Sequence, residues 1–135
     1  MIPANRANGN QTLILIKPLV FLRVLRDLYW LYAFSRINKV LHLIFQSPIE
    51  TAVLERTEAG DAVVFIGNSV GMTLRQGRLA ESLVAMAQSR LLYVLSDDIV
   101  MRGIAHEALA AGIDVIDYSG LVALTLEHKV IQSWY

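Results

Sequence analysis

Short hydrophobic runs alternate with polar segments from Val40 to the end of the chain. Runs of four or five mostly apolar residues predict strands at residues 41–45, 62–66, 91–95 and 113–116, with a short fifth strand at 130–133. The segments between these runs predict helices at residues 50–58, 76–87, 96–103, 104–111 and 118–127.

This alternation of strands and helices predicts an α/β fold with three layers, α/β/α, around a mainly parallel central sheet. Parallel strands need crossover connections, which are right-handed and place helices on both faces of the sheet. In such folds the functional residues lie beyond the carboxyl ends of the strands. We therefore expect them in the segments that follow each strand.

The first 39 residues differ from the rest in charge. They carry six Lys and Arg residues against one Asp, a net charge of +5, whereas residues 40–135 carry six bases against eleven acids, a net charge of −5. Charged residues also interrupt the apolar stretch from 13 to 39. No uncharged run in it is as long as the roughly 18 residues that a membrane-spanning helix needs. No signal-peptide cleavage pattern follows. We expect an N-terminal extension at residues 1–39 and the domain at residues 40–135.

The start of the strand pattern directly after Val40 suggests an origin for this extension. Valine can be encoded by a codon with which bacteria also start translation, so residues 1–39 are interpreted as upstream sequence without an evolved fold. Peptides from residues 11–36 in the native protein would contradict this interpretation. The alternative is a basic amphipathic helix that lies on a membrane surface.

Composition excludes several classes of function. The chain contains no cysteine, which excludes disulfides, thiolate metal sites, thiol nucleophiles and persulfide carriers on this polypeptide. The acidic domain lacks the clustered Lys and Arg that bind phosphates, so we expect no direct contact with nucleic acid. His42, His106 and His128 show no metal-ligand spacing. We expect no metal and no cofactor.

One motif suggests catalysis. The sequence from Gly67 to Gly71 spells G-x-S-x-G between a predicted strand and a helix, and Ser69 is followed by several aspartates and then by His128, the chain order of an α/β-hydrolase. Only one strand precedes this one in the domain, fewer than such enzymes need. A nucleotide-binding loop is a second alternative, although the P-loop Lys is absent. The simplest interpretation is a turn of small residues.

Two further groups stand out at the ends of predicted elements. Asp97 and Asp98 follow the third strand, where the Ser-Asp sequence at 96–97 predicts a helix cap. Trp134 and Tyr135 end the chain, and we expect this aromatic pair at an interface with a partner, because aromatic residues are favoured at interface centres.

Several short motifs of the domain together resemble the DsrH/TusB family. They are Leu41-His42 with Ser47-Pro48, then Tyr93-Val94-Leu95 with Asp97 and Arg102-Gly103-Ile104, and then the tail. The tail is the most specific part, with Ile116-Asp117-Tyr118, Val122, Leu124-Thr125, His128 and Gln132-Ser133-Trp134 at matching separations. The resemblance covers residues 40–135.

The resemblance implies a DsrE/F/H-like fold and a place as the third subunit of a cytoplasmic heterohexamer that relays sulfur. Its siblings would be DsrE/TusD-like and DsrF/TusC-like subunits, and a DsrC/TusE-like protein would accept the sulfur. The persulfide rides on a cysteine of the DsrE/TusD-like subunit and travels towards 2-thiouridine at the tRNA wobble position. Dissimilatory sulfur oxidation is the alternative destination.

This chain departs from some family members, which carry a cysteine in the first helix, because residues 51–58 read TAVLERTE. A thiolate is needed to hold sulfane sulfur, so we expect a non-catalytic subunit. We also expect no contact of the domain with a membrane. The resemblance gives the positions that are expected to form structural contacts or touch a partner: Asp97, Arg102, Gly103, Asp117, Tyr118, Thr125, His128, Gln132, Trp134 and Tyr135.

Overall fold

The computed structural model describes residues 23–28 and 39–135. The chain divides into two units, residues 1–35 and 36–135, which are considered separately. Residues 23–28 of the first unit are helical and expose Val24, Leu25 and Leu28. The interpretation of residues 1–39 as upstream sequence falls mainly on residues outside those described, and it stays a prediction.

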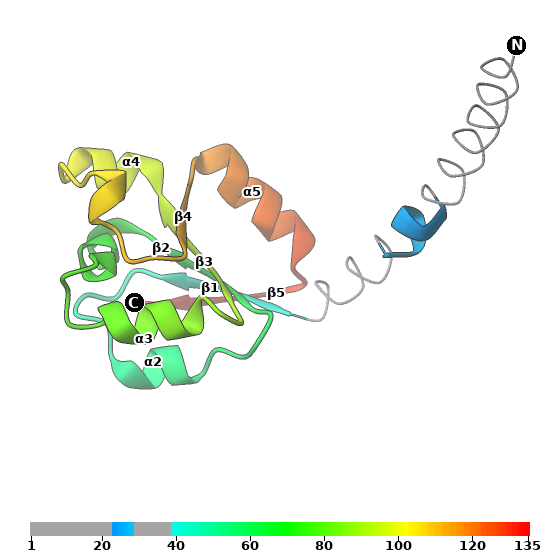
Figure 1. The fold of residues 1–135 in the computed structure, drawn as a ribbon, viewed down its shortest axis with the longest axis horizontal. Helices are drawn as coiled ribbons and strands as arrows, with labels where there is room; N and C mark the ends of the chain where they lie inside the picture. The colour runs from blue at the N-terminus through cyan, green and yellow to red at the C-terminus, as the bar shows by residue number, and fades with distance from the viewer. Residues whose placement is uncertain (1–22, 29–38) are drawn as a thin grey trace, which may run out of the picture. The chain divides into compact units, whose positions relative to one another are not determined.

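The second unit is built on a five-stranded parallel sheet (Figure 1). Its strands are β1 (Val40–Ile44), β2 (Ala62–Phe65), β3 (Leu91–Leu95), β4 (Ile113–Ile116) and β5 (Val130–Trp134). Their spatial order is β4-β3-β2-β1-β5, so the chain moves outward from β1 to β4 and then returns to the other side of β1. The predicted parallel sheet and the fifth strand are confirmed.

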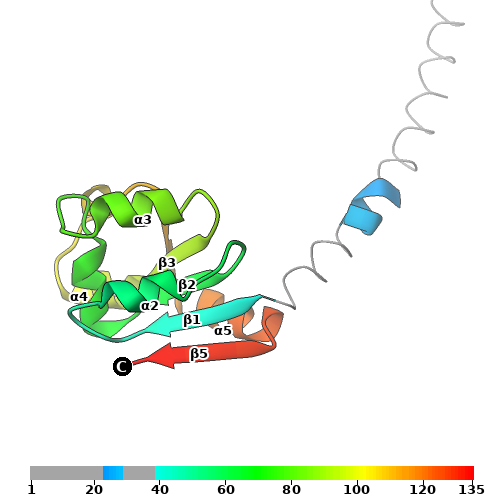
Figure 2. The ribbon, with the colours of Figure 1, turned by 90° about the horizontal axis from the view of Figure 1, so that it is seen from below.

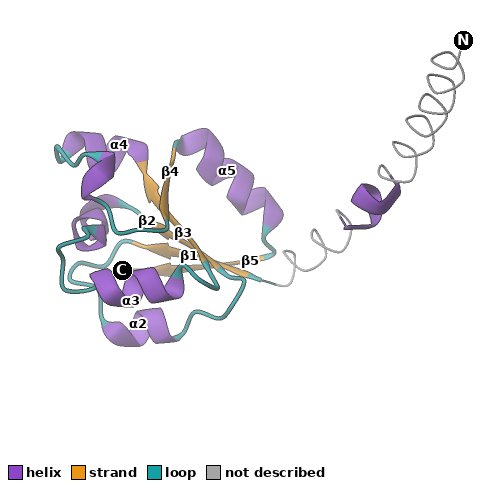
Figure 3. Cartoon of the chain, viewed as in Figure 1, coloured by secondary structure: helices purple, strands orange, loops and turns teal. Residues whose placement is uncertain are grey.

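Helices lie on both faces of this sheet, as Figure 3 shows, and the predicted three layers are confirmed. The first face carries α2 (Thr51–Glu55) and α3 (Ala80–Met86), which lie side by side in Figure 2. The second face carries α5 (Tyr118–Glu127). The short helix α4 (Ser96–Met101) follows β3 directly and contacts the 3-10 helix η1 (Gly67–Thr73) after β2.

The hydrophobic core is unequal on the two faces. On the first face fourteen buried residues form one cluster, which includes Phe65, Leu83 and Ile49. On the second face the buried cluster consists of four residues: Leu41, Ala62, Val64 and Leu124. All four residues of β2 are buried, as expected for a strand in the middle of a sheet that is covered on both faces.

Two predicted helices are shorter than expected. The helix predicted at residues 50–58 ends at Glu55, because the Thr57 hydroxyl donates to Leu54 O at 2.7 Å and the Glu58 N–H donates to the Asp61 carboxylate at 2.9 Å. Local hydrogen bonds from such side chains compete with continuation of a helix. The helix predicted at 76–87 begins only at Ala80, since a turn precedes it.

Two further predictions were wrong. The loop expected at residues 67–71 is the 3-10 helix η1. The helix expected at residues 104–111 is reduced to the 3-10 turn η2 (His106–Ala108). Its backbone pairs instead with the end of η1 and the residues that follow it. Ala108 O accepts from Arg75 N, and Ala110 N donates to Thr73 O, each at 2.8 Å. This tertiary pairing competes for the hydrogen bonds that a helix would use.

Candidate functional site

A buried hydrogen-bond network joins β1, β5 and the turn before β2. His42 of β1 lies between the carboxylate of Asp61 and the indole of Trp134, which ends β5. The His42 Nε2 atom is 3.0 Å from Asp61 Oδ2, and Trp134 Nε1 donates to His42 Nδ1 at 3.2 Å. An indole N–H can only donate, so Nδ1 must be the acceptor and Nε2 carries the proton that is donated to Asp61. We call His42, Asp61 and Trp134 the β1/β5 network.

Asp61 is ionised within this network. Burial raises the pKa of its carboxyl, but hydrogen bonds from the backbone N–H groups of Glu58 and Val40 and from His42 lower it, and the resulting pKa lies below the usual value of an aspartate. The carboxylate thus satisfies three donors from two segments of chain. It ties the start of β1 to the turn before β2.

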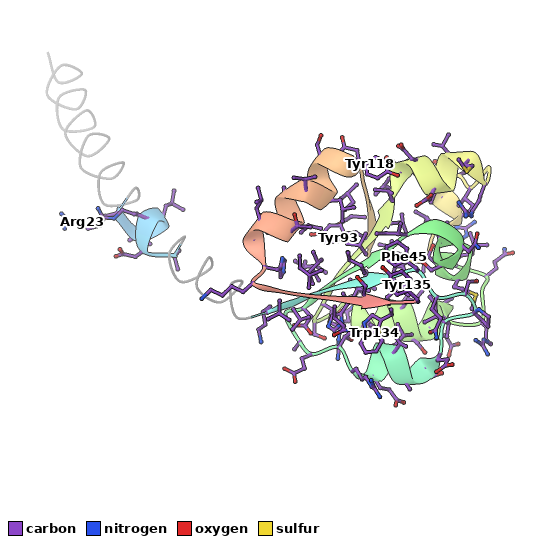
Figure 4. All side chains as sticks on the ribbon, turned by 180° about the vertical axis from the view of Figure 1, so that it is seen from behind. Arg23, Phe45, Tyr93, Tyr118, Trp134 and Tyr135 are labelled. Atoms are coloured by element: carbon purple, nitrogen blue, oxygen red, sulfur yellow. The ribbon has the colours of Figure 1, made fainter. Side chains whose placement is uncertain are left out.

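Trp134 and Tyr135 lie in different environments, although the sequence suggested a common role at an interface. The Trp134 ring is partly buried and packs 6.2 Å from the His42 ring, with the Arg56 guanidinium 5.4 Å from its centroid. Tyr135 is 84% exposed and stacks on Phe45 at 5.1 Å. Figure 4 shows Tyr135 beside Phe45 and Trp134 on the other side of β5. Trp134 therefore stabilises the domain, and Tyr135 presents the accessible aromatic surface.

A second polar cluster lies at the carboxyl ends of β2 and β3, where the fold predicts a site. We call Gly67, Asn68, Asp98 and Arg102 the carboxyl-end cluster. The Gly67 N–H donates to Asp98 Oδ2 at 2.8 Å, and Arg102 donates to Asn68 Oδ1 at 2.7 Å. Arg102 also approaches Asp98 Oδ1 at 3.6 Å. These contacts join the start of η1 to α4.

The expected helix cap at Ser96 and Asp97 was wrong. No side chain caps the N-terminus of α4, because the residue at the N-cap position is the apolar Leu95. Asp98 accepts instead from the peptide N–H of Gly67, at the start of η1. Gly103, after α4, has a φ of +66°, a conformation that favours glycine.

The geometry contradicts the hydrolase hypothesis. Ser69 is fully buried. Its hydroxyl donates to the carbonyl oxygens of Ile44, at 2.6 Å, and Ile66, at 2.9 Å. A nucleophile elbow must present its serine to solvent beside a histidine. His128 instead bonds through Nδ1 to Leu124 O at 2.7 Å. Ser69 therefore anchors η1 to the sheet.

The nucleotide-binding alternative also lacks support from this segment. Residues 67–73 form a 3-10 helix in which Ser69, Val70 and Thr73 are buried, rather than an open loop. The first N–H of that helix, on Gly67, already binds the Asp98 carboxylate, whose negative charge would repel a phosphate.

The tail residues of the family motif make mainly contacts within the domain. Asp117 caps α5 by accepting from Gly120 N at 2.8 Å, and the Thr125 hydroxyl donates to Val122 O. His128 is buried, and its Nε2 has no hydrogen-bond partner among the described residues. Gln132 is exposed on β5 and donates to Ser133 O at 3.2 Å.

The outer surface of α5 is apolar. Tyr118, Val122 and Leu126 follow one another at a spacing of four residues and are 56%, 57% and 83% exposed. This spacing places them along one side of the helix. Contiguous exposed apolar residues of this kind mark contacts with other proteins more often than scattered ones do.

The described part of the chain offers no group of three or more His, Asp or Glu side chains that could hold a metal. Among the helices of residues 23–28 and 39–135, none is long and apolar enough to cross a membrane.

Sequence reasoning missed the roles of His42, Asp61, Asn68 and Asp98. The role of Asp61 could have been inferred from the sequence, because this acid directly precedes a buried strand and a carboxylate that is buried there needs hydrogen-bond donors. The partners of Asn68 and Asp98 could not be found in this way. Arg102 and Asp98 are separated by 34 and 31 residues from the η1 groups they bind.

Solved structures share this fold. The crystal structure of the ychN protein from E. coli superposes with a TM-score of 0.59 at 14% identity, covering 71% of this chain and 98% of that chain. A protein of unknown function, MTH1491 from Methanobacterium thermoautotrophicum, superposes with a TM-score of 0.54 at 16% identity, covering 65% of this chain and 90% of that one. At these identities the similarity establishes the fold alone.

Sequence comparisons go further. The family model described as DsrH like protein matches residues 45–131. Proteins named TusB match over 98 residues, 70% of this chain and 100% of theirs, with 30% identity in Buchnera aphidicola subsp. Baizongia pistaciae and 33% in Pectobacterium parmentieri. The TusB of Escherichia coli K12 is 29% identical over the same length. The resemblance inferred from the tail motifs is confirmed, and the chain belongs to the DsrH family.

Proposed function

We propose that this chain is the non-catalytic, TusB-type subunit of a heterohexameric sulfur-relay complex that passes persulfide sulfur towards 2-thiolation of the tRNA wobble uridine. The observation that carries the proposal is the match to the DsrH family over residues 45–131 in a chain without cysteine. Relatives named TusB that align along their whole length support it. In this role the chain acts in the cytoplasm, without direct contact with nucleic acid or membrane.

The absence of a thiol separates this subunit from the chemistry of the complex. Sulfane sulfur travels as a persulfide, which requires a thiolate that attacks and then carries the sulfur atom. No side chain of this protein can do this. The reactive cysteine belongs to a DsrE/TusD-like sibling, and a DsrC/TusE-like protein receives the sulfur.

The contribution of this chain is then a surface for its siblings. The apolar residues on the outside of α5, Tyr118, Val122 and Leu126, supply such a surface, on the face of the sheet whose own core is small. Removing such residues from water on assembly is favourable at about 25 cal/mol per Å² of apolar surface. We assign this side of α5 to contact with a DsrE/TusD-like or DsrF/TusC-like sibling.

The proposal is tested in a strain that lacks the gene for this chain. Wobble 2-thiouridine is measured by mass spectrometry of tRNA nucleosides after the strain receives the wild-type chain, Val122→Lys or Val84→Lys. Val84 is an exposed valine on α3, on the opposite face of the sheet, and serves as the matched control. We expect the wild type and Val84→Lys to restore thiolation and Val122→Lys to lose most of it, because a buried unpaired lysine opposes assembly.

Unchanged 2-thiouridine in the deletion strain would contradict the thiolation role. Full restoration by Val122→Lys would contradict only the assignment of α5 to the sibling contact. As a control, circular dichroism of both purified variants should match that of the wild type, which would show that each variant retains the fold.

A further inference from the structure

The two edges of the sheet differ in how they are protected. β4 reads Ile-Asp-Val-Ile and carries the exposed charge of Asp114. β5 reads Val-Ile-Gln-Ser-Trp and has neither a charged residue nor a proline. Charges and prolines on an edge strand prevent pairing with another strand. The β5 edge lacks these features, so it is suited to pairing with a strand of another molecule.

The backbone of β5 shows which groups face outward. Trp134 O accepts from Phe45 N of the β1 side at 2.8 Å, so the backbone of Trp134 faces β1. Backbone groups alternate in direction along a strand, so Gln132 and Val130 also face β1. The N–H and C=O groups of Ile131 and Ser133 therefore face away from the sheet. No strand of the described residues pairs with these four groups, because β5 ends the sheet. Ser133 O accepts from the side chain of Gln132 at 3.2 Å, an exposed hydrogen bond that pairing with another strand would replace.

We propose that this edge binds the β5 strand of a second copy of the same chain. In an antiparallel pair centred on Gln132, Ile131 lies opposite the Ser133 of the second copy, and Ser133 opposite its Ile131. Residues opposite each other in a hydrogen-bonded pair exchange both of their bonds. All four outward groups of each copy are then satisfied by one two-fold arrangement, the commonest symmetry of protein dimers.

The side chains agree with this register. Val130 and Ile131 are 55% and 43% exposed, so pairing along β5 would remove part of this apolar surface from water. The pairing places Val130 opposite the Trp134 of the second copy on one face, and Ile131 opposite its Ser133 on the other. No like charges meet, because β5 carries none. This dimer goes beyond the proposed function, since it requires no sibling subunit.

The test is sedimentation of the purified full-length chain over a concentration series. We expect a monomer–dimer equilibrium with a dissociation constant of about 100 µM or lower. Ile131→Pro removes one outward N–H from each copy, and hence two of the four hydrogen bonds of the pair, so it should weaken the dimer about tenfold or more. Ile131→Val keeps the N–H and is the matched control, for which we expect less than a threefold change.

The Ile131→Pro monomer should still fold, because proline is tolerated on an edge strand where the replaced N–H faces away from the sheet. Ser133→Pro tests the same prediction should Ile131→Pro fail to fold. A chain that stays monomeric throughout the series would overturn the proposal, and so would a dimer that neither proline substitution weakens. A dimer that forms only after removal of residues 1–38 would also overturn it, because the chain's own N-terminal segment would then occupy the edge.

Discussion

The two faces of the sheet are built differently. Fourteen buried residues form the cluster on the face that carries α2 and α3, to which η1 and α4 also contribute, whereas four form the buried cluster under α5. The helix on the second face keeps Tyr118, Val122 and Leu126 exposed. The first face completes a hydrophobic core, and the second presents apolar surface outward.

This difference separates folding from assembly. In the proposed role, a subunit without cysteine contributes its stability and its surfaces, and the large core and the apolar side of α5 lie on opposite faces of the sheet. Substitutions on the first face should therefore lower stability, whereas those on the outside of α5 should leave the monomer intact. The following predictions test this comparison.

The largest effect is expected from Leu83→Ala on the first face. Leu83 is fully buried between α3 and the sheet, so its truncation leaves a cavity and should cost about 3 kcal/mol of unfolding free energy in a urea titration. Leu126→Ala, the matched truncation on α5, should cost about 0.5 kcal/mol or less because the side chain is 83% exposed. Equal losses in the two variants would remove the distinction between the faces.

Asp61→Ala should cost slightly less, about 2–3 kcal/mol, because it leaves the buried donor of His42 and the partly buried N–H groups of Val40 and Glu58 without their acceptor. The same measurement on Asp114→Ala, which removes an exposed carboxylate from β4, should give a change within about 0.5 kcal/mol. An Asp61→Ala variant with an unchanged unfolding free energy would show that the β1/β5 network contributes nothing to stability.

The contribution of Asp61 should also depend on pH. Its pKa is lower in the folded chain than in the unfolded chain, so protons bind the unfolded state first as the pH falls. The stabilisation is complete above the unfolded pKa of about 3.9 and is lost as the pH falls through the lower folded pKa. The stability difference between the wild type and Asp61→Asn, measured by urea titration from neutral pH downward, should narrow in that window. A constant difference would argue against an ionised Asp61.

The smallest effect is expected from Arg102→Ala at the carboxyl-end cluster. Its ion pair with Asp98 spans 3.6 Å and is partly exposed to solvent, so the loss should be about 0.5–1 kcal/mol. Met101→Ala, on the neighbouring and 80% exposed residue, is the control and should change stability less. A loss of several kcal/mol for Arg102→Ala would show that the carboxyl-end cluster contributes as much to stability as the buried core does.

Most of the fold could be predicted from the sequence, because apolar runs and polar breaks mark local structure. The strands at 62–65, 91–95 and 113–116 and the helix at 118–127 follow this pattern closely. The segment 104–111 could not be predicted, since its alanines favour a helix locally but its backbone pairs with residues 73–75. Such long-range pairing leaves no trace in local periodicity.

The roles of individual side chains were harder to predict than their positions. The tail motif identified the family, yet it did not reveal that Trp134 points inward to His42 while Tyr135 points outward. The two residues alternate across a strand, and the side they face depends on the register of β5 with β1. That register becomes visible only in the folded sheet.

The most direct test of the sulfur-relay role is the native mass of the complex formed when the tagged chain is expressed together with its two sibling subunits. The account predicts a stoichiometric heterohexamer with two copies of each subunit, which Val122→Lys disrupts and Val84→Lys preserves. A chain that purifies without either sibling, while the siblings assemble normally in its absence, would contradict it.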